Sequence, residues 1–110
     1  MGREVSIFGT VKFDNGAYSR ASGSTNWKVE PIPGFGLPVG PPLGQVKVEF
    51  AAPLKSDYTV LVTAQRIVTT PMLCVNCEQT DRTGFVVNIF EPVSTRTLQN
   101  GGFSFLVIAD

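Results

Sequence analysis

The sequence contains no histidine and only two cysteines, which excludes several kinds of active site. Histidine is the commonest general base and the commonest metal ligand, so acid–base and metal chemistry lose their usual residue. A structural zinc site needs four ligands, and Cys74 and Cys77 supply only two. The sequence also shows no phosphate-binding loop, nucleophile elbow or pattern of paired carboxylates in a cleft. We therefore expect a protein that is not an enzyme and that holds no metal or cofactor.

Charge is also scarce. Charged residues make up only 16% of the chain, whereas about 25% is typical of a soluble domain. The nine basic residues balance the nine acidic ones and are scattered singly, so no basic stripe exists that would neutralise phosphates. We expect no nucleic acid as a partner. The shortage of charge is typical of a chain that has much of its surface in contact with another protein.

Long apolar runs are absent as well. No stretch reaches the ~18 apolar residues of a membrane-spanning helix, and residues 1–5 lack the apolar core of a signal peptide. We therefore expect a soluble product without membrane insertion. A length of 110 residues allows a single domain, residues 1–110, and leaves no room for a second core.

The sequence does contain repeated alternation of apolar and other side chains, which is typical of β-strands. Helical periodicity is not sustained anywhere. The expected strands are residues 5–13, 27–30, 45–50, 58–68, 72–77, 85–90 and 103–109, with a short segment at 17–20. A tight turn is expected at Asp14-Asn15-Gly16, a loop at 21–26 and a charged turn at 78–82. The expected fold class is all-β, an antiparallel β-sandwich of six to eight strands.

Residues 31–44 hold five prolines and four glycines. Proline removes ladder donors and glycine weakens strands, so we expect no regular element there. Phe35, Leu37 and Leu43 interrupt the segment, and a flexible linker would not carry such apolar residues. We expect an ordered loop, which either lies on its own domain or docks onto a neighbour.

The last two expected strands are apolar on both faces. The face expected to build the core consists of Phe85, Val87, Ile89, Phe103, Phe105 and Val107. The opposite face is too apolar for water, and so short a chain has little of its own to cover it. A partner chain is the simplest cover, so we expect an oligomer. The candidate interface residues are Phe35, Leu61, Val86, Phe90, Leu106 and Ile108.

A series of short pieces occurs in a familiar order. They are Gly9-Thr10-Val11, Asn15-Gly16, Ser22-Gly23, residues 45–50, Pro53-Leu54, residues 58–63, residues 83–87 and residues 102–108. The most specific are Thr83-Gly84-Phe85-Val86 and Phe103-Ser104-Phe105. Together they cover most of the chain except residues 31–44. In this order they resemble a domain at the tips of phage tail fibres and in related bacterial proteins, which is similar in turn to H-type lectins.

This resemblance implies an H-type-lectin-like sandwich that assembles as a homotrimer, with a hexamer left open. It implies binding of a surface glycan or another host receptor at exposed loops or subunit grooves. It also implies a place in a virion or tail fibre, or outside the cell after release. The alternative function is a structural or assembly protein of a phage or bacterial particle without a sugar site. The alternative fold is a jelly-roll trimer.

Polar groups at strand ends and in loops suit hydrogen bonding to sugar hydroxyls, and arginine suits a carboxylate. An aromatic ring can stack on a sugar ring, with core packing as the competing interpretation. The candidate ligand-binding residues are Trp27, Arg66, Asn76, Gln79, Asp81 and Arg82. Cys74 and Cys77 are expected to be ordinary reduced cysteines whose side chains point to opposite faces of a strand, because they lie three residues apart. A thiol redox pair is the less favoured alternative.

Overall fold

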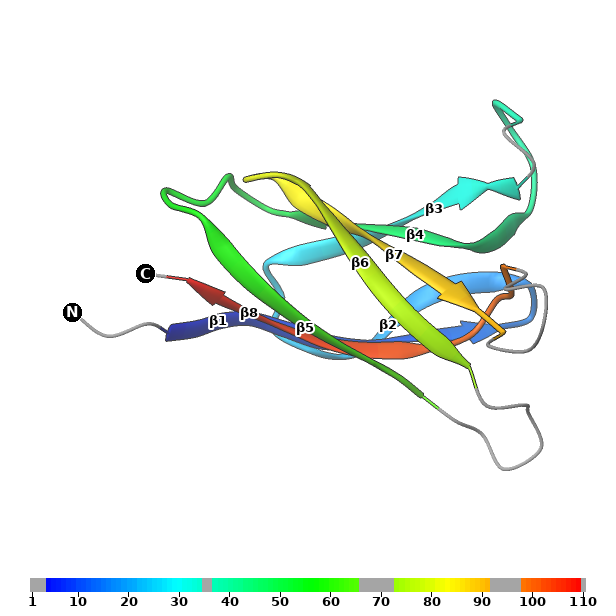
Figure 1. The fold of residues 1–110 in the computed structure, drawn as a ribbon, viewed down its shortest axis with the longest axis horizontal. Helices are drawn as coiled ribbons and strands as arrows, with labels where there is room; N and C mark the ends of the chain where they lie inside the picture. The colour runs from blue at the N-terminus through cyan, green and yellow to red at the C-terminus, as the bar shows by residue number, and fades with distance from the viewer. Residues whose placement is uncertain (1–3, 35–36, 66–72, 92–97, 110) are drawn as a thin grey trace.

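The computed structural model describes residues 4–34, 37–65, 73–91 and 98–109, which form eight strands and no α-helix. The strands are β1 (Glu4–Asp14), β2 (Ala17–Gly23), β3 (Trp27–Pro33), β4 (Pro42–Phe50), β5 (Tyr58–Ala64), β6 (Cys74–Asp81), β7 (Gly84–Phe90) and β8 (Phe103–Ala109). Sheet A has the order β2-β1-β8-β5 and sheet B the order β3-β4-β7-β6. Figure 1 shows the sheets as two facing layers. All neighbouring strands are antiparallel, so the predicted all-β antiparallel architecture is confirmed.

The core lies between the two sheets. The predicted core face is confirmed, since the buried residues include Phe85, Val87, Ile89, Phe103, Phe105 and Val107. The ring of Phe105 in β8 meets the rings of Trp27 and Phe85 edge-on, at centroid distances of 4.9 and 5.3 Å. These edge-to-face contacts join sheet A to two strands of sheet B, and such pairs add stability beyond the burial of their area.

The first hairpin has the turn that its sequence predicts. Asn15 and Gly16 both have positive φ, 51° and 79°, as a type I′ turn requires. Asparagine and glycine adopt this backbone at little cost. β1 therefore continues directly into β2, with Asp14 opposite Ala17.

Three strands reach further than the sequence predicts. β3 continues through Pro31 to Pro33, and β4 begins at Pro42, inside the segment expected to hold no regular element. β3 is an edge strand, where a proline can sit without depriving the sheet of a ladder hydrogen bond. Residues 21–23, expected as part of a loop, complete β2, which is also an edge strand.

The charged turn expected at residues 78–82 is shorter than predicted. β6 runs on to Asp81 because its residues stay paired with β7. Only Arg82 and Thr83 form the turn. β5 ends at Ala64, and the last three residues of the strand expected there lie outside the described residues.

Two tyrosines close opposite ends of the sandwich. The Tyr58 hydroxyl donates to two backbone oxygens at the β6–β7 turn, at 2.8 and 2.6 Å, and so links sheet A to sheet B. The Tyr18 hydroxyl donates to Asn100 Oδ1 at 2.9 Å and accepts from the Gly101 N–H at 3.1 Å. Burial raises the pKa of each tyrosine to about 12, and the nearby negative charge of Asp81 adds to the increase at Tyr58.

Candidate functional site

The outer face of sheet A carries apolar side chains across three neighbouring strands. Phe8 of β1 and Leu61 of β5 both lie opposite Leu106 of β8 in the strand register. Phe8 is 47% and Leu61 53% exposed, and Leu106 between them is half-buried. We call these three residues the apolar row. Contiguous exposed apolar side chains of this kind are typical of an interaction surface.

The strand segments that carry the apolar row contain no charged residue. β5, β8 and the stretch of β1 from Val5 to Val11 contain no Asp, Glu, Lys or Arg. The next row consists of Thr10, Ser104 and Thr63, and the first two hydroxyls are hydrogen-bonded at 2.9 Å. β5 is the edge strand of sheet A. It has none of the lysines or prolines that protect a strand edge from pairing with another chain.

The outer face of sheet B is polar instead. Gln45 Nε2 donates to Asn88 Oδ1, and Asn88 Nδ2 donates to Asn76 Oδ1, each at 2.9 Å. These three side chains form an amide ladder across β4, β7 and β6. The ammonium of Lys28 lies 3.0 Å from the carboxylate of Glu49 on the same sheet. Contacts within the chain therefore satisfy this face without a partner.

The predicted interface residues do not form one surface. Leu61, Leu106 and Ile108 belong to sheet A, whereas Val86 and Phe90 belong to sheet B. On sheet B, Val86 pairs with charged residues of β4 and β6. An interface formed by the apolar row would therefore include the first three residues and leave out the other two.

Two further interface candidates need separate mention. Phe90 forms an isolated bridge with Leu98, so another part of the same chain lies beside it. Phe35 lies outside the described residues. Phe90, on sheet B, therefore does not extend the apolar row on sheet A.

Trp27 belongs to the core, which corrects its prediction as a sugar-stacking residue. Its side chain is buried, and its Nε1–H donates to the Phe8 backbone oxygen at 3.0 Å. The indole fills the space that a side chain at Gly9 would need, since a Cβ there would lie 2.1 Å from the ring. The Arg20 guanidinium covers the ring from outside at 5.4 Å from its centroid. No open ring face remains for a sugar.

Asp81 and Arg82 are engaged in the turn that holds them. The Asp81 carboxylate accepts hydrogen bonds from the hydroxyl and the backbone N–H of Thr83, which lower its pKa below the usual value. Arg82 donates to the Lys55 backbone oxygen at 3.0 Å and lies 3.5 Å from the Asp57 carboxylate. Both side chains therefore stabilise the turn and its neighbouring loop.

The other predicted ligand-binding residues lie apart from this turn or outside the described part of the chain. Asn76 is one end of the amide ladder. Gln79 pairs with Phe85 in the register of β6 and β7. Arg66 lies outside the described residues. Of the candidates whose side chains the structure describes, Trp27, Asn76 and the pair of Asp81 and Arg82 lie in three separate places.

Cys74 and Cys77 are free and lie on opposite faces of β6, as predicted. Cys77 packs against the core, and burial raises the pKa of its thiol. A raised pKa suppresses the thiolate that redox chemistry requires. Within the described part of the chain, no three or more Cys, Asp or Glu side chains gather as a metal site would need.

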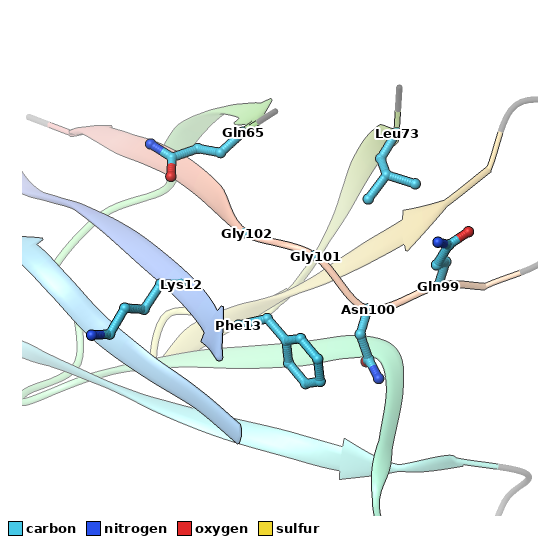
Figure 2. A pocket seen from close by; sticks show the side chains of 8 residues that line it. All are labelled: Lys12, Phe13, Gln65, Leu73, Gln99, Asn100, Gly101 and Gly102. Atoms are coloured by element: carbon cyan, nitrogen blue, oxygen red, sulfur yellow. The ribbon is translucent and has the colours of Figure 1, made fainter. Parts of the chain in front are cut away.

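A pocket of about 140 Å³ opens where sheet A ends beyond the hydroxyls of Thr10 and Ser104. Its lining consists of Lys12, Phe13, Gln65, Leu73, Gln99, Asn100, Gly101 and Gly102. In Figure 2, Gln65 and Leu73 lie on one side of the backbone that runs through the two glycines, and Lys12 and Phe13 lie on the other. The fold therefore joins residues from the end of β1, the end of β5 and the approach to β8.

Gly102 makes room for this pocket because it has no side chain. Gly102 directly precedes β8 and lies between Lys12 of β1 and Gln65, the residue after β5. The Gln65 N–H donates to the Gly102 backbone oxygen at 2.9 Å. A Cβ on Gly102 would lie 2.9 Å from the Val11 backbone oxygen, too close for normal packing, and in ordinary contact with Gln65 at 3.7 Å. Sequence reasoning missed this site, and its only signal was a glycine pair directly before a strand.

No protein-family model, curated protein or solved structure matches this chain. The resemblance to tail-fibre tips and H-type lectins therefore remains an interpretation of the residues, and function is argued from the geometry. A helix long and apolar enough to cross a membrane does not occur among the described residues.

Proposed function

We propose that this chain is a non-enzymatic binding module that acts as a homotrimer and recognises a surface glycan or another host receptor. The observation that carries the proposal is the apolar row of Phe8, Leu61 and Leu106. It contains no charged residue, is partly exposed and crosses β1, β8 and the edge strand β5 of sheet A. A monomer would leave these side chains in water, whereas association would bury them in every copy.

Burial of the apolar row supplies a driving force for association. Complete burial of a Phe or Leu side chain is worth about 1.5–3 kcal/mol. Phe8 and Leu61 each have about half of their surface still to bury, so together they contribute about 1.5–3 kcal/mol per copy. A row that faces a threefold axis contacts both neighbours, and the uncharged rows beside it lose no ion solvation.

Multivalency connects the trimer to binding. The pocket at the end of sheet A has a volume of about 140 Å³, which is small beside the roughly 300–1,000 Å³ of sites that enclose a drug-sized ligand. A shallow site of this size binds weakly on its own. Three such sites on one rigid base gain avidity when their ligands are displayed together on a surface.

A glycan array probed with the intact oligomer tests this function. We expect the wild-type chain to bind a subset of surface glycans. Leu61→Glu, which places a charge in the apolar row, should bind at least tenfold more weakly while its fold is retained, because avidity is lost with the trimer. Silence of the wild-type oligomer on the array would contradict the proposal.

A structural or assembly role is the second candidate, and the connection between β3 and β4 favours it. This connection projects beyond the two sheets in Figure 1. Leu37 is 53% and Val39 80% exposed there, between prolines and glycines that restrict or bend the backbone. Exposed apolar side chains on a projecting loop are suited to docking onto another component of a particle.

The two candidates differ in what the projecting loop does. The assembly role predicts that Leu37→Ser combined with Val39→Ser prevents incorporation into a particle without changing the mass of the free oligomer. The receptor-binding role predicts that the same pair of changes leaves glycan binding intact. Incorporation that survives the double substitution would remove the assembly role.

A further inference from the structure

The outer face of sheet A changes from apolar to polar along its strands, and the pocket at Gly102 lies at the polar end. The apolar row comes first, then the hydroxyls of Thr10 and Ser104, and then Lys12 and Gln65 on either side of Gly102. Gln65 Nε2 donates to Ser104 Oγ at 3.1 Å, which holds the amide at the rim of the pocket. The pocket therefore lies on the same face as the proposed interface but at the other end of the strands.

The lining of this pocket favours an anionic ligand. Lys12 is the only charged residue among the eight lining residues. No carboxylate of the described residues lies within ion-pair distance of its ammonium. The remaining polar side chains in the lining are the carboxamides of Gln65, Gln99 and Asn100, which both donate and accept hydrogen bonds.

The same pocket has an apolar side. Phe13 and Leu73 line it together with the bare backbone of Gly101 and Gly102, and Figure 2 shows these two side chains on opposite sides of that backbone. Asn100 is held in place, since its Oδ1 accepts from the Gly44 N–H at 2.8 Å. A ligand that fits must combine a negative group, hydroxyls and a C–H surface.

We propose that this pocket binds an acidic sugar residue of the hexuronate class, a proposal that rests on the glycan-binding function proposed above. The Lys12 ammonium pairs with the sugar carboxylate, and the amides of Gln65 and Gln99 bond to ring hydroxyls. The ring lies over Gly101 and Gly102 with its C–H side toward the apolar lining. The volume of about 140 Å³ equals roughly five water molecules at about 30 Å³ each, enough for the polar edge of one sugar residue.

Two other polar surfaces contain polar side chains that bond to one another. The amide ladder on sheet B uses the hydrogen bonds of Gln45, Asn88 and Asn76 on one another. A more open hollow of about 390 Å³ lies beside the β3–β4 pair, but its cation and its carboxylate, Lys28 and Glu49, form an ion pair at 3.0 Å. The hollow beside β3 and β4 therefore offers no unpaired cation to a carboxylate.

Titration with three small molecules, followed by amide chemical shifts, tests this site. Glucuronate has both the ring and the carboxylate, glucose has only the ring, and acetate has only the carboxylate. We expect glucuronate to shift the amides of Gly101 and Gly102 at lower concentration than either of the others. Equal responses to glucose would overturn the role of Lys12, and equal responses to acetate would overturn the choice of a sugar.

Substitutions of Lys12 and of a control lysine test whether glucuronate binding depends on the charge of Lys12. Lys12→Gln should weaken glucuronate binding about fivefold to tenfold, as expected for a charge-assisted hydrogen bond at a partly open site. Lys12→Arg keeps the charge and should retain most of the binding. Lys55→Gln removes an equal charge from an exposed loop outside the pocket and should change nothing. An amide spectrum of each variant confirms that the fold is kept.

The outcomes separate this inference from the proposed function. If wild-type oligomer binds acidic glycans on the array and Lys12→Gln binds them equally well, the Gly102 pocket is not the site but the binding function stands. If the array is silent and glucuronate produces no shift, both fail. Glucuronate binding that depends on Lys12 but not on Lys55 supports the site directly.

Discussion

The two sheets of this molecule have similar inner faces and very different outer faces. On both sheets the inner face is a continuous array of buried apolar side chains. Outside, sheet B presents the ladder of Gln45, Asn88 and Asn76, whose amides satisfy one another. Sheet A presents the apolar row of Phe8, Leu106 and Leu61.

We infer from this difference that the inner faces of both sheets serve folding of the monomer, whereas the outer face of sheet A is suited to association. Inner faces of both sheets are needed to form the monomer, because each covers the other. The polar outer face of sheet B is complete in the monomer. The apolar row on sheet A is only about half buried in the monomer, and the proposed association would bury the rest.

The largest effect is expected from a charge in the apolar row. Leu61→Glu would bury an unpaired carboxylate in the proposed interface, which costs about 3 kcal/mol or more and corresponds to more than a hundredfold loss in association. Sedimentation velocity should show a folded monomer. Val86→Glu on the outer face of sheet B is the matched control and should leave the mass unchanged. A monomeric Val86→Glu variant together with an unchanged mass for Leu61→Glu would place the interface on sheet B.

The link between the sheets is expected to have the next largest effect. Tyr58→Phe removes the two hydrogen bonds to the β6–β7 turn and should lower the free energy of unfolding by about 2 kcal/mol, because buried carbonyls lose their donor. Urea unfolding measures this change. A loss below the error of the measurement would show that Tyr58 does not join the sheets.

Tyr58 also gives a pH dependence with a definite sign. Its pKa rises from 10.0 to about 12 on folding, mainly because of burial. The neutral hydroxyl therefore contributes stability that is complete below pH 10 and is lost as the pH rises toward 12. The stability difference between wild type and Tyr58→Phe should shrink across that range, when measured at matched ionic strength. A difference that stays constant would contradict this assignment.

The polar face of sheet B predicts a smaller effect. Asn88→Leu breaks both hydrogen bonds of the amide ladder and should destabilise the monomer by about 1 kcal/mol. It also creates a new apolar patch, so self-association should increase beyond the native mass. Asn88→Gln, which keeps the amide, is the control. Unchanged stability and mass in Asn88→Leu would show that the ladder is not what keeps this face free.

The smallest effect is expected from the surface ion pair. Lys28→Ala removes a partner of Glu49 at 3.0 Å, and an exposed pair of this kind contributes little to stability because water screens it. The loss should disappear in high salt, which screens exposed charges. A loss that persists at high salt would indicate packing by the lysine stem rather than charge.

Much of the fold could be predicted from alternation alone. The inner faces of β7 and β8 were identified from their sequence, because period-2 burial follows directly from strand geometry. Pro31 and Pro33 were misjudged because edge position, which only the sheet order reveals, makes a proline harmless. The Asn15-Gly16 turn was predicted correctly, since its backbone depends on those two residues themselves.

The candidate site was much less predictable. Leu106 and Val86 follow the same pattern in sequence, and only the pairing of strands assigns them to different sheets. The burial of Trp27 could not be predicted from its own sequence context. It depends on the space above Gly9, which a side chain at that position would fill. The pocket at Gly102 is lined by four segments that are distant in the sequence, so it leaves almost no trace there.

We propose that the apolar row on sheet A is a subunit interface. The most direct test is the solution mass of the wild-type chain, measured by light scattering during size-exclusion chromatography over a wide range of concentration. The account predicts a constant mass of three chains. A monomer that persists at the highest concentration would contradict it, and the apolar row would then be a surface that the chain tolerates in water.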